Sequence, residues 1–335
     1  MKKLVLHIGV KKTGSTTLQQ FLSKNRPNLR EQNAVYLRSP GKIVGGKFFE
    51  LFQAREPDRT KVDNFTAAFR REILGCEDTG VRVAIASDEA LCEMRRDSAV
   101  ALQQFLSSFF KEVEIVVYLR RQDEAMASHY STSLRGGGTR LVPLPEEPDL
   151  KLKTLHYEQM LEVWASAFGE SWVRPRLYDR KELIDGDLLR DFLTVCGLNP
   201  NGNFNHIDNA NTELSKDVQL FMGMLNKHIP ARINGKPNPA RGPLFHMFDD
   251  FPDTGKGMKP TRGEAEAFYQ NFREINENVR RRWFKGREKL FDEDFSKYPE
   301  KRSDVLTPER AVEIAAFMWS KLQRRGSGDD DESEG

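Results

Sequence analysis

The chain has 335 residues, of which 38% are hydrophobic and 30% charged, and its formal net charge is only +2 at pH 7. This length allows one large domain or two ordinary ones, and the near-neutral charge gives no indication of a nucleic-acid partner. No segment approaches the roughly 18 apolar residues of a membrane span, and the apolar run 4–10 is too short for a signal peptide, so we expect a cytoplasmic protein with no membrane partner.

The first predicted element is a strand that leads through a glycine loop into a helix. Residues 4–8 form an apolar run, and a helical pattern begins at Thr16. The first N–H groups of a helix have no partner within it and carry partial positive charge, so an anion binds well there. Gly14 allows the backbone to approach a phosphate, and the hydroxyls of Ser15, Thr16 and Thr17 add donors. The stretch therefore predicts a phosphate-binding loop.

The register of this loop differs from that of the nucleotide-triphosphatase loop, Gly-x-x-x-x-Gly-Lys-Ser/Thr. Gly9 and Gly14 match its glycines and Thr16 matches its hydroxyl, but Ser15 stands at the lysine position. A lysine occurs instead at Lys12, inside the loop. The positive charge is therefore expected to meet a different part of the ligand than it does in a triphosphatase.

Further along the chain, apolar runs predict strands at residues 35–37, 81–86 and 113–119, and a strand is expected at 172–178, with Arg174 and Arg176 alternating outward. Helical patterns occur at 48–52, 64–74, 100–110, 155–168, 187–193, 216–225, 262–284 and 308–322. The alternation predicts an α/β fold of three layers, in which helices cover both faces of a central parallel sheet that carries the P-loop-like phosphate-binding loop. We expect a single domain over residues 1–325, with a helical C-terminal part at about 211–325, and a disordered acidic tail at 326–335.

Two further groups of polar residues follow predicted strands. Ser87, Asp88 and Glu89 come after one strand, Arg120 ends the next, and Ser128 follows on the predicted helix beyond it. Because ligands of parallel sheets bind at the carboxyl ends of the strands, both groups and the first loop are expected at one edge. An arginine fork and a hydroxyl can clasp a phosphate from two sides.

These residues resemble a known family. Lys-Thr-Gly-Ser-Thr-Thr-Leu, which begins at Lys12, is similar to the 5′-phosphosulfate loop of sulfotransferases that use 3′-phosphoadenosine 5′-phosphosulfate (PAPS). Arg120 with Ser128 resembles their 3′-phosphate site, although Gln122 replaces a proline that many members carry. The resemblance implies that a sulfuryl group passes from this cosubstrate to an acceptor hydroxyl and leaves adenosine 3′,5′-bisphosphate, with no need for a metal.

The resemblance also implies a role for each residue. Lys12 would contact the oxygen that bridges phosphate and sulfate, the segment that begins at Thr13 and ends at Thr17 would hold the 5′-phosphate, and Arg120 and Ser128 the 3′-phosphate. Ser-Asp-Glu resembles the Ser-x-Glu stretch of carbohydrate sulfotransferases, whose glutamate takes the acceptor's proton. Glu89 is therefore the expected base, and a carbohydrate or another small molecule the expected acceptor.

The identity of the base has alternatives. A carboxylate with a raised pKa can accept the acceptor's proton, so Asp88 competes with Glu89, although one of the two is expected to cap the next helix. His7 lies inside a predicted strand and is expected to be a core residue, and His129 is expected to pack beside the site.

Two other functions fit part of the pattern. In a nucleotide kinase or triphosphatase, Asp88 and Glu89 would hold magnesium, but the loss of the lysine at Ser15 argues against this function. A nucleotide-binding scaffold without turnover is disfavoured by the joint presence of the four side chains assigned above.

A long segment and three cysteines complete the sequence analysis. Residues 229–260 are rich in Pro, Gly and Asn and predict a long loop of the kind that often serves as a lid. Cys76, Cys92 and Cys196 are widely spaced and form no Cys-x-x-Cys pair, so neither a disulfide framework nor a zinc site is predicted. The sequence gives no indication of the oligomeric state.

Overall fold

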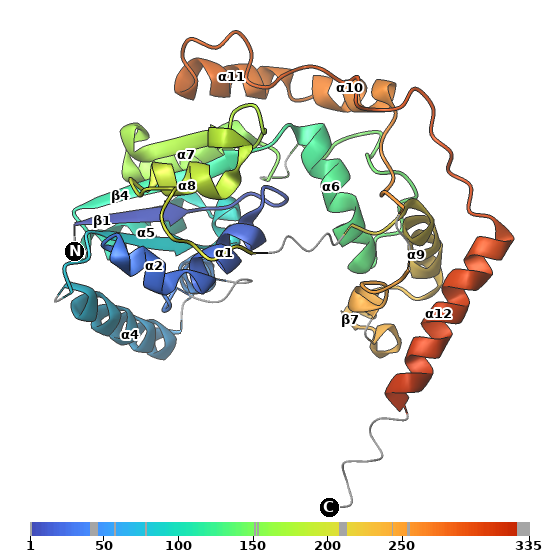
Figure 1. The fold of residues 1–335 in the computed structure, drawn as a ribbon, viewed down its shortest axis with the longest axis horizontal. Coiled ribbons are helices and arrows are strands. Elements are labelled where there is room, and N and C mark those ends of the chain that lie inside the picture. The colour runs from blue at the N-terminus through green and yellow to red at the C-terminus, as the bar shows by residue number, and fades with distance from the viewer. Residues whose placement is uncertain are drawn as a thin grey trace, which may run out of the picture. The chain divides into compact units, whose positions relative to one another are not determined.

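The computed structural model describes residues 2–40, 46–56, 58–77, 79–150, 152, 154–207, 213–242, 244–252 and 255–326. The expected disordered tail, 326–335, lies outside these residues except for its first one. The chain forms two compact units, each built from three stretches (Figure 1). Unit 1 comprises Met1–Gln122, Asp149–Asn209 and Asn271–Asp292, and unit 2 comprises Asp123–Pro148, Ala210–Gln270 and Glu293–Gly335. The single domain over 1–325 stays a prediction.

Unit 1 is organised around a parallel sheet. Its strands are β1 (Lys3–His7), β2 (Ala34–Tyr36), β3 (Val83–Ser87), β4 (Glu112–Leu119) and β5 (Val173–Leu177). They form a five-stranded sheet in the order β2-β3-β1-β4-β5, and every pair is parallel. The predicted α/β class is therefore confirmed. Because β1 is the central strand, the loop that follows it has a strand end on either side.

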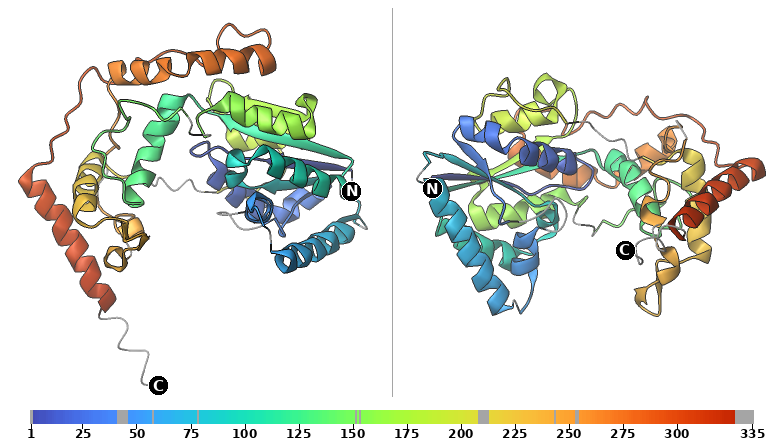
Figure 2. Two further views of the ribbon diagram at one scale, coloured as in Figure 1. Left: turned by 180° about the vertical axis from the view of Figure 1, so that it is seen from behind. Right: turned by 60° about the horizontal axis from the view of Figure 1, so that its bottom comes forward.

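Helices cover both faces of this sheet, as the right-hand view of Figure 2 shows. The helices of unit 1 are α1 (Ser15–Lys24), α2 (Arg26–Glu31), α3 (Lys47–Gln53), α4 (Arg59–Glu77), α5 (Arg96–Ser107), α7 (Tyr157–Phe168), α8 (Leu188–Val195) and α11 (Arg273–Trp283). On one face α1 contacts α2 and α8, and on the other α5 contacts α7. A short 3₁₀ helix, η1 (Glu89–Glu93), links β3 to α5. The three-layer arrangement agrees with the sequence expectation.

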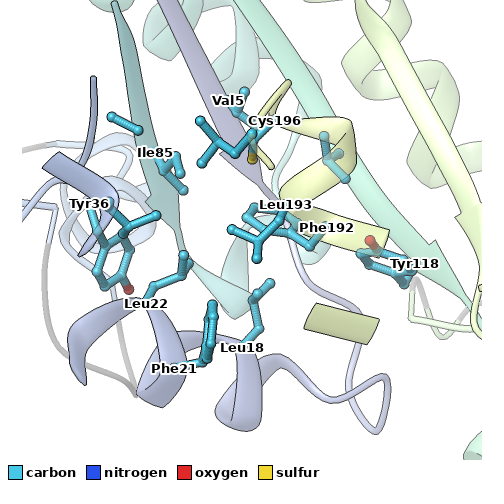
Figure 3. Packing of buried hydrophobic residues seen from close by; sticks show 14 of the residues in the cluster. Val5, Leu18, Phe21, Leu22, Tyr36, Ile85, Tyr118, Phe192, Leu193 and Cys196 are labelled. Carbon is cyan, nitrogen blue, oxygen red and sulfur yellow. The ribbon is translucent and has the colours of Figure 1, made fainter. Parts of the chain in front are cut away.

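A hydrophobic cluster fixes α1 and α8 against the sheet (Figure 3). Residues from three strands meet residues from both helices in it: Val5, Ile85, Tyr118, Leu18, Leu22, Phe192 and Leu193. Full burial of one such side chain stabilises the fold by about 1.5–3 kcal/mol. The phosphate-binding loop is thus held at both ends, by β1 and by α1.

A buried ion pair adds a polar tie between α8 and the sheet. Asp191 has no exposed surface, and its carboxylate accepts hydrogen bonds from the guanidinium of Arg176 at 2.6 Å and from the hydroxyl of Tyr118 at 2.7 Å. Because a buried carboxylate is stable only when it is paired and hydrogen-bonded, these partners define one position for α8.

Unit 2 is helical. It contains α6 (Gln122–Arg135, apart from its first residue), α9 (Lys216–His228), α10 (Arg262–Gln270) and α12 (Pro308–Gly326), together with a two-residue hairpin of β6 (Arg232–Ile233) and β7 (Lys236–Pro237). Its core joins apolar residues of α6, α9 and α12 with those of the connecting segments: Tyr130, Leu134, Val218, Met222, Met247, Phe248 and Ile314. In the described part of the chain, no helix has both the length and the apolar character needed to cross a bilayer.

Two predicted segments differ from the structure. The helix expected over 262–284 is two helices, α10 and α11, because the chain turns at Phe272, whose side chain is completely buried, and passes from unit 2 to unit 1 there. The segment 229–260 is not a plain loop: Asn234 and Gly235, with φ of 51° and 76°, form the tight turn of the β6–β7 hairpin.

Candidate active site

The sheet register brings three polar motifs to one edge. His7, the last residue of β1, pairs with Ser87 of β3 and with Val116 of β4. The amide of Asp88 donates to the carbonyl of His7 at 3.0 Å, so the chain that carries Glu89 leaves the sheet beside the phosphate-binding loop. The structure confirms the expected common edge for the loop, Glu89 and Arg120.

The loop between β1 and α1 has an unusual backbone. Lys12 has φ of 67° and Gly14 has φ of 79°, both in the left-handed region. A Cβ on Gly14 would lie 2.5 Å from Leu188 Cδ2, and a Cβ on Gly9 would lie 2.6 Å from Ser15 Oγ. Both glycines are therefore needed for the loop to close. A lysine in the left-handed region is strained, and such strain is concentrated at functional sites.

The hydroxyls of the loop are used in two ways. Thr13 Oγ1 donates to the carbonyl of Val10 at 2.6 Å, and Ser15 Oγ donates to the same carbonyl at 3.4 Å. Both side chains are buried, so they close the loop upon itself. Thr16 is exposed and Thr17 half-buried on the first turn of α1. Contacts of all these residues with a phosphate stay predictions.

The start of α1 suits an anion. Gly14 is its N-cap and offers no side-chain cap, and no acidic residue lies in the first turn. No acidic residue of that turn therefore opposes the partial positive charge of the helix dipole. Phosphate groups bind readily at a helix terminus of this kind.

Arg120 contacts the loop between β1 and α1. Its Nη1 donates to the carbonyl of Lys12 at 3.0 Å, and its guanidinium lies 5.5 Å from the centre of the Tyr178 ring. The hydroxyl of Tyr157 donates to the backbone carbonyl of Arg120 at 2.6 Å and so fixes the end of β4. The guanidinium therefore lies against the backbone of the loop that carries Lys12.

Tyr178 is a site residue that the sequence motifs did not indicate. It follows β5 directly, so it belongs to the same edge, and its amide donates to the carbonyl of Leu119 at 2.7 Å. Its hydroxyl lies 3.4 Å from the point where a Cβ on Gly14 would stand. Only its place as the last residue of the predicted strand 172–178 could have suggested this position.

Asp88 is a structural residue. Its carboxylate accepts from the amides of Ala90 at 3.1 Å, which caps η1, and of Phe49 at 3.1 Å, at the start of α3. It is 1% exposed. Burial raises the pKa of Asp88, although hydrogen bonds from Phe49, Ala90 and Gly46 act in the opposite direction. The carboxylate therefore ties η1 to α3, as the capping alternative for this residue expected.

Glu89 has the electrostatic properties of a base. It begins η1 and is half-buried. Burial raises the pKa of Glu89, and the positive charges of Lys11 and Lys12 partly oppose this effect. The carboxyl group consequently lies in the field of the lysine that was expected to stabilise a leaving oxygen. Lys11 is also paired with Glu93 at 3.0 Å.

The two histidines differ in their surroundings. His7 is completely buried, its Nδ1 is 2.8 Å from Ser87 Oγ, and burial lowers its pKa to about 4. Gln19 of α1 donates to the same hydroxyl at 3.0 Å, so this cluster joins β1, β3 and α1 beneath the loop. His129 and Ser128 lie on α6 in unit 2, and their roles stay predictions.

The comparisons with known proteins leave the family open. No family model matches the chain. An uncharacterized protein of Archaeoglobus fulgidus is 28% identical over 235 residues, which is 69% of this chain and 62%, less than two thirds, of the relative's own length. A sulfotransferase structure from Alicyclobacillus acidocaldarius covers 67% of this chain and 92% of that chain, with 14% sequence identity and a TM-score of 0.39. That score is too low for a relationship to be inferred from it.

Proposed function

We propose that the protein is a sulfotransferase that uses PAPS and transfers its sulfuryl group to the hydroxyl of a carbohydrate or another small metabolite. The observation that carries the proposal is that Glu89 at the start of η1 and Arg120 at the end of β4 lie at the loop that carries Lys12. The guanidinium of Arg120 binds the carbonyl of Lys12, and the carboxyl of Glu89 lies in the field of the same lysine. A cation at the loop, a second cation for another phosphate and a base with a raised pKa are what this reaction needs.

The residues present fit the nucleotide. A Cβ on Gly9 would meet Ser15 and a Cβ on Gly14 would meet Leu188, so the loop can keep this conformation only because both residues are glycine. The first turn of α1 would hold the 5′-phosphate, Arg120 with Ser128 the 3′-phosphate, and Lys12 the oxygen between phosphate and sulfate. When bound, the cosubstrate supplies an activated sulfuryl group.

Each side chain then has a simple task. Lys12 stabilises the negative charge that grows on the bridging oxygen as its bond to sulfur breaks. Glu89 accepts the hydroxyl proton of the acceptor while the acceptor oxygen forms the new bond to sulfur. The products are a sulfate ester and adenosine 3′,5′-bisphosphate, and the proton is on Glu89. Arg120 contributes by positioning.

The surroundings of two residues argue against the kinase or triphosphatase alternative. Ser15, at the position of the missing lysine, is buried and turned back to the carbonyl of Val10. Asp88, one of the two residues that would hold magnesium, is bound by backbone amides at the starts of η1 and α3. Both side chains are thus engaged by backbone groups, which argues against their use in phosphoryl transfer.

A turnover assay tests the proposal. The release of adenosine 3′,5′-bisphosphate from PAPS is measured with a panel of hydroxyl acceptors in the presence of EDTA. We expect acceptor-dependent release that falls at least about 100-fold in Glu89→Gln, the size of a general-base contribution. Hydrolysis of magnesium-ATP at a higher rate, with no acceptor-dependent release from PAPS, would favour the phosphoryl-transfer alternative instead.

A further inference from the structure

A cavity in unit 1 has no task in the chemistry proposed above. Its volume is about 250 Å³, and it lies between the end of η1, the start of α5 and the second turn of α7. Buried side chains of Cys92, Met94 and Met160 line it, and Arg95, Arg96 and Glu162 are its charged residues. The cavity therefore combines an apolar, sulfur-rich wall with a charged one.

This cavity lies next to the expected base. Cys92 is one 3₁₀ turn from Glu89, and its thiol donates to the carbonyl of Glu89 at 3.2 Å. Three residues of a 3₁₀ helix advance about 6 Å. The first residue of α7, Tyr157, donates to the carbonyl of Arg120 at 2.6 Å, so α7 also begins at the edge of the sheet that carries the site. A molecule in the cavity is consequently within a few ångströms of the turn that carries Glu89.

The charged wall favours an anion. Two arginines and one glutamate line the cavity, and Glu162 is already paired with Arg282 and lies 3.7 Å from Arg96. Arg95 is the N-cap of α5, so the start of that helix lies at the cavity, and its guanidinium pairs with Asp97 of the first turn at 3.3 Å. The two arginines and Arg282 together outnumber Glu162 and Asp97 by one charge. An arginine fork matches a carboxylate in geometry and charge.

The apolar wall and the volume limit the size and the chemical character of the group that can carry such an anion. Methionine sulfur packs favourably against an aromatic ring, and Met94 and Met160 are both 2% exposed or less. The volume lies below the roughly 300–1,000 Å³ of pockets for drug-sized ligands, so it suits one ring and its substituents.

We propose that this cavity binds the acceptor, and that the acceptor is a small aromatic carboxylic acid that carries a hydroxyl group. This inference rests on the proposed function. The carboxylate binds Arg95 and Arg96, the ring packs on the two methionines, and the hydroxyl reaches toward Glu89. The acceptor oxygen then gains the sulfuryl group and its proton passes to Glu89, while adenosine 3′,5′-bisphosphate leaves.

Calorimetry with 4-hydroxyphenylacetate tests the cavity on the full chain, saturated with adenosine 3′,5′-bisphosphate. We expect binding to weaken at least ten-fold in the double variant Arg95→Gln/Arg96→Gln and in Val163→Phe, which fills the cavity from α7. The exposed Arg82, just before β3 at the opposite edge, supplies the matched control Arg82→Gln, which should leave binding unchanged. The uncharged 4-hydroxyphenethyl alcohol should bind the wild type more weakly than the acid does. Its affinity for the double variant should equal its affinity for the wild type.

Affinity for adenosine 3′,5′-bisphosphate shows that each variant is folded and separates the two proposals. Two results would overturn the cavity proposal and leave the proposed function standing, provided that the wild type binds the nucleotide. In the first, the wild type binds the acid no more tightly than the alcohol; in the second, all variants bind the acid as tightly as the wild type does. Tighter binding of glucose than of the acid overturns it as well. If the wild type does not bind the nucleotide at all, the proposed function fails, and the acceptor role fails with it.

Discussion

Lys12 combines two properties that rarely occur together: a long charged side chain and a left-handed backbone with φ of 67°. An L-residue in that region costs about 1–2 kcal/mol relative to a right-handed conformation. The surrounding contacts hold it there, among them the hydrogen bond from Arg120 to its carbonyl. Backbone strain of this kind is concentrated at functional sites, which agrees with the task proposed for its ammonium group.

Replacing Lys12 by glycine or alanine separates strain from function. Lys12→Gly removes the strain, so we expect roughly 0.5–1 kcal/mol more stability after the entropic cost of glycine is deducted. Lys12→Ala keeps the strained backbone and should show no such gain. Both variants should lose about 100-fold or more in turnover, the cost of removing one group that stabilises the developing charge. Urea unfolding and initial rates measure the two effects, and full activity in Lys12→Gly would contradict the assigned role.

The pH dependence of turnover tests the charge around Glu89. Burial raises the pKa of this carboxyl and Lys11 and Lys12 lower it, with a net rise. Only the ionised form accepts a proton, so activity should fall on the acidic side at a pH above the ordinary glutamate pKa of about 4.3. Lys11→Met removes a charge that favours ionisation, so the pKa rises further and the acidic limb moves to higher pH.

The exposed Lys111, which precedes β4 at the far edge of the sheet, gives the matched control Lys111→Met. Its removal should leave the acidic limb in place. A limb that shifts equally in both variants, or in neither, would show that a group other than Glu89 determines the rate.

At the scale of elements, the strands could be predicted from the sequence, but their order in the sheet could not. The strands β1 to β4 are mostly buried and appear as apolar runs, whereas β5 carries the exposed Arg174 and the half-buried Arg176 between its buried ends. All five were predicted. The central place of β1 depends on contacts between distant segments. The choice between Asp88 and Glu89 likewise depends on a contact with a distant segment, because the amide of Phe49 at the start of α3 donates to the carboxylate of Asp88. Periodicity alone also extended one helix through Phe272, where the chain in fact turns.

The loop and α1 form the element on which the site depends, and Gly14→Ala tests it. Its Cβ would meet Leu188 at 2.5 Å, and its φ of 79° disfavours alanine. We expect a loss of about 2 kcal/mol or more of stability, together with weaker nucleotide binding. Gly75→Ala in α4 is the control, since nothing lies within 4 Å of its Cβ, and it should stabilise the protein by roughly 0.5–1 kcal/mol. Equal effects of the two substitutions on urea unfolding would refute the close packing of the loop.

At the scale of the whole molecule, the division into two units was hidden from sequence reading. Each unit is assembled from three separate stretches, so composition changes at no single boundary. Unit 1 holds Lys12, Glu89 and Arg120, and unit 2 holds Ser128. The proposed nucleotide carries two phosphates, and each of them is expected to contribute separately to affinity.

Calorimetry of adenosine 3′,5′-bisphosphate in EDTA tests this central claim most directly. The account predicts tight binding without magnesium, much weaker binding of 5′-AMP, and a loss of about 2 kcal/mol or more in Arg120→Ala, the scale for breaking a charged hydrogen-bonded pair. Equal affinity for 5′-AMP and the bisphosphate, or an Arg120→Ala variant that binds as well as the wild type, would contradict it.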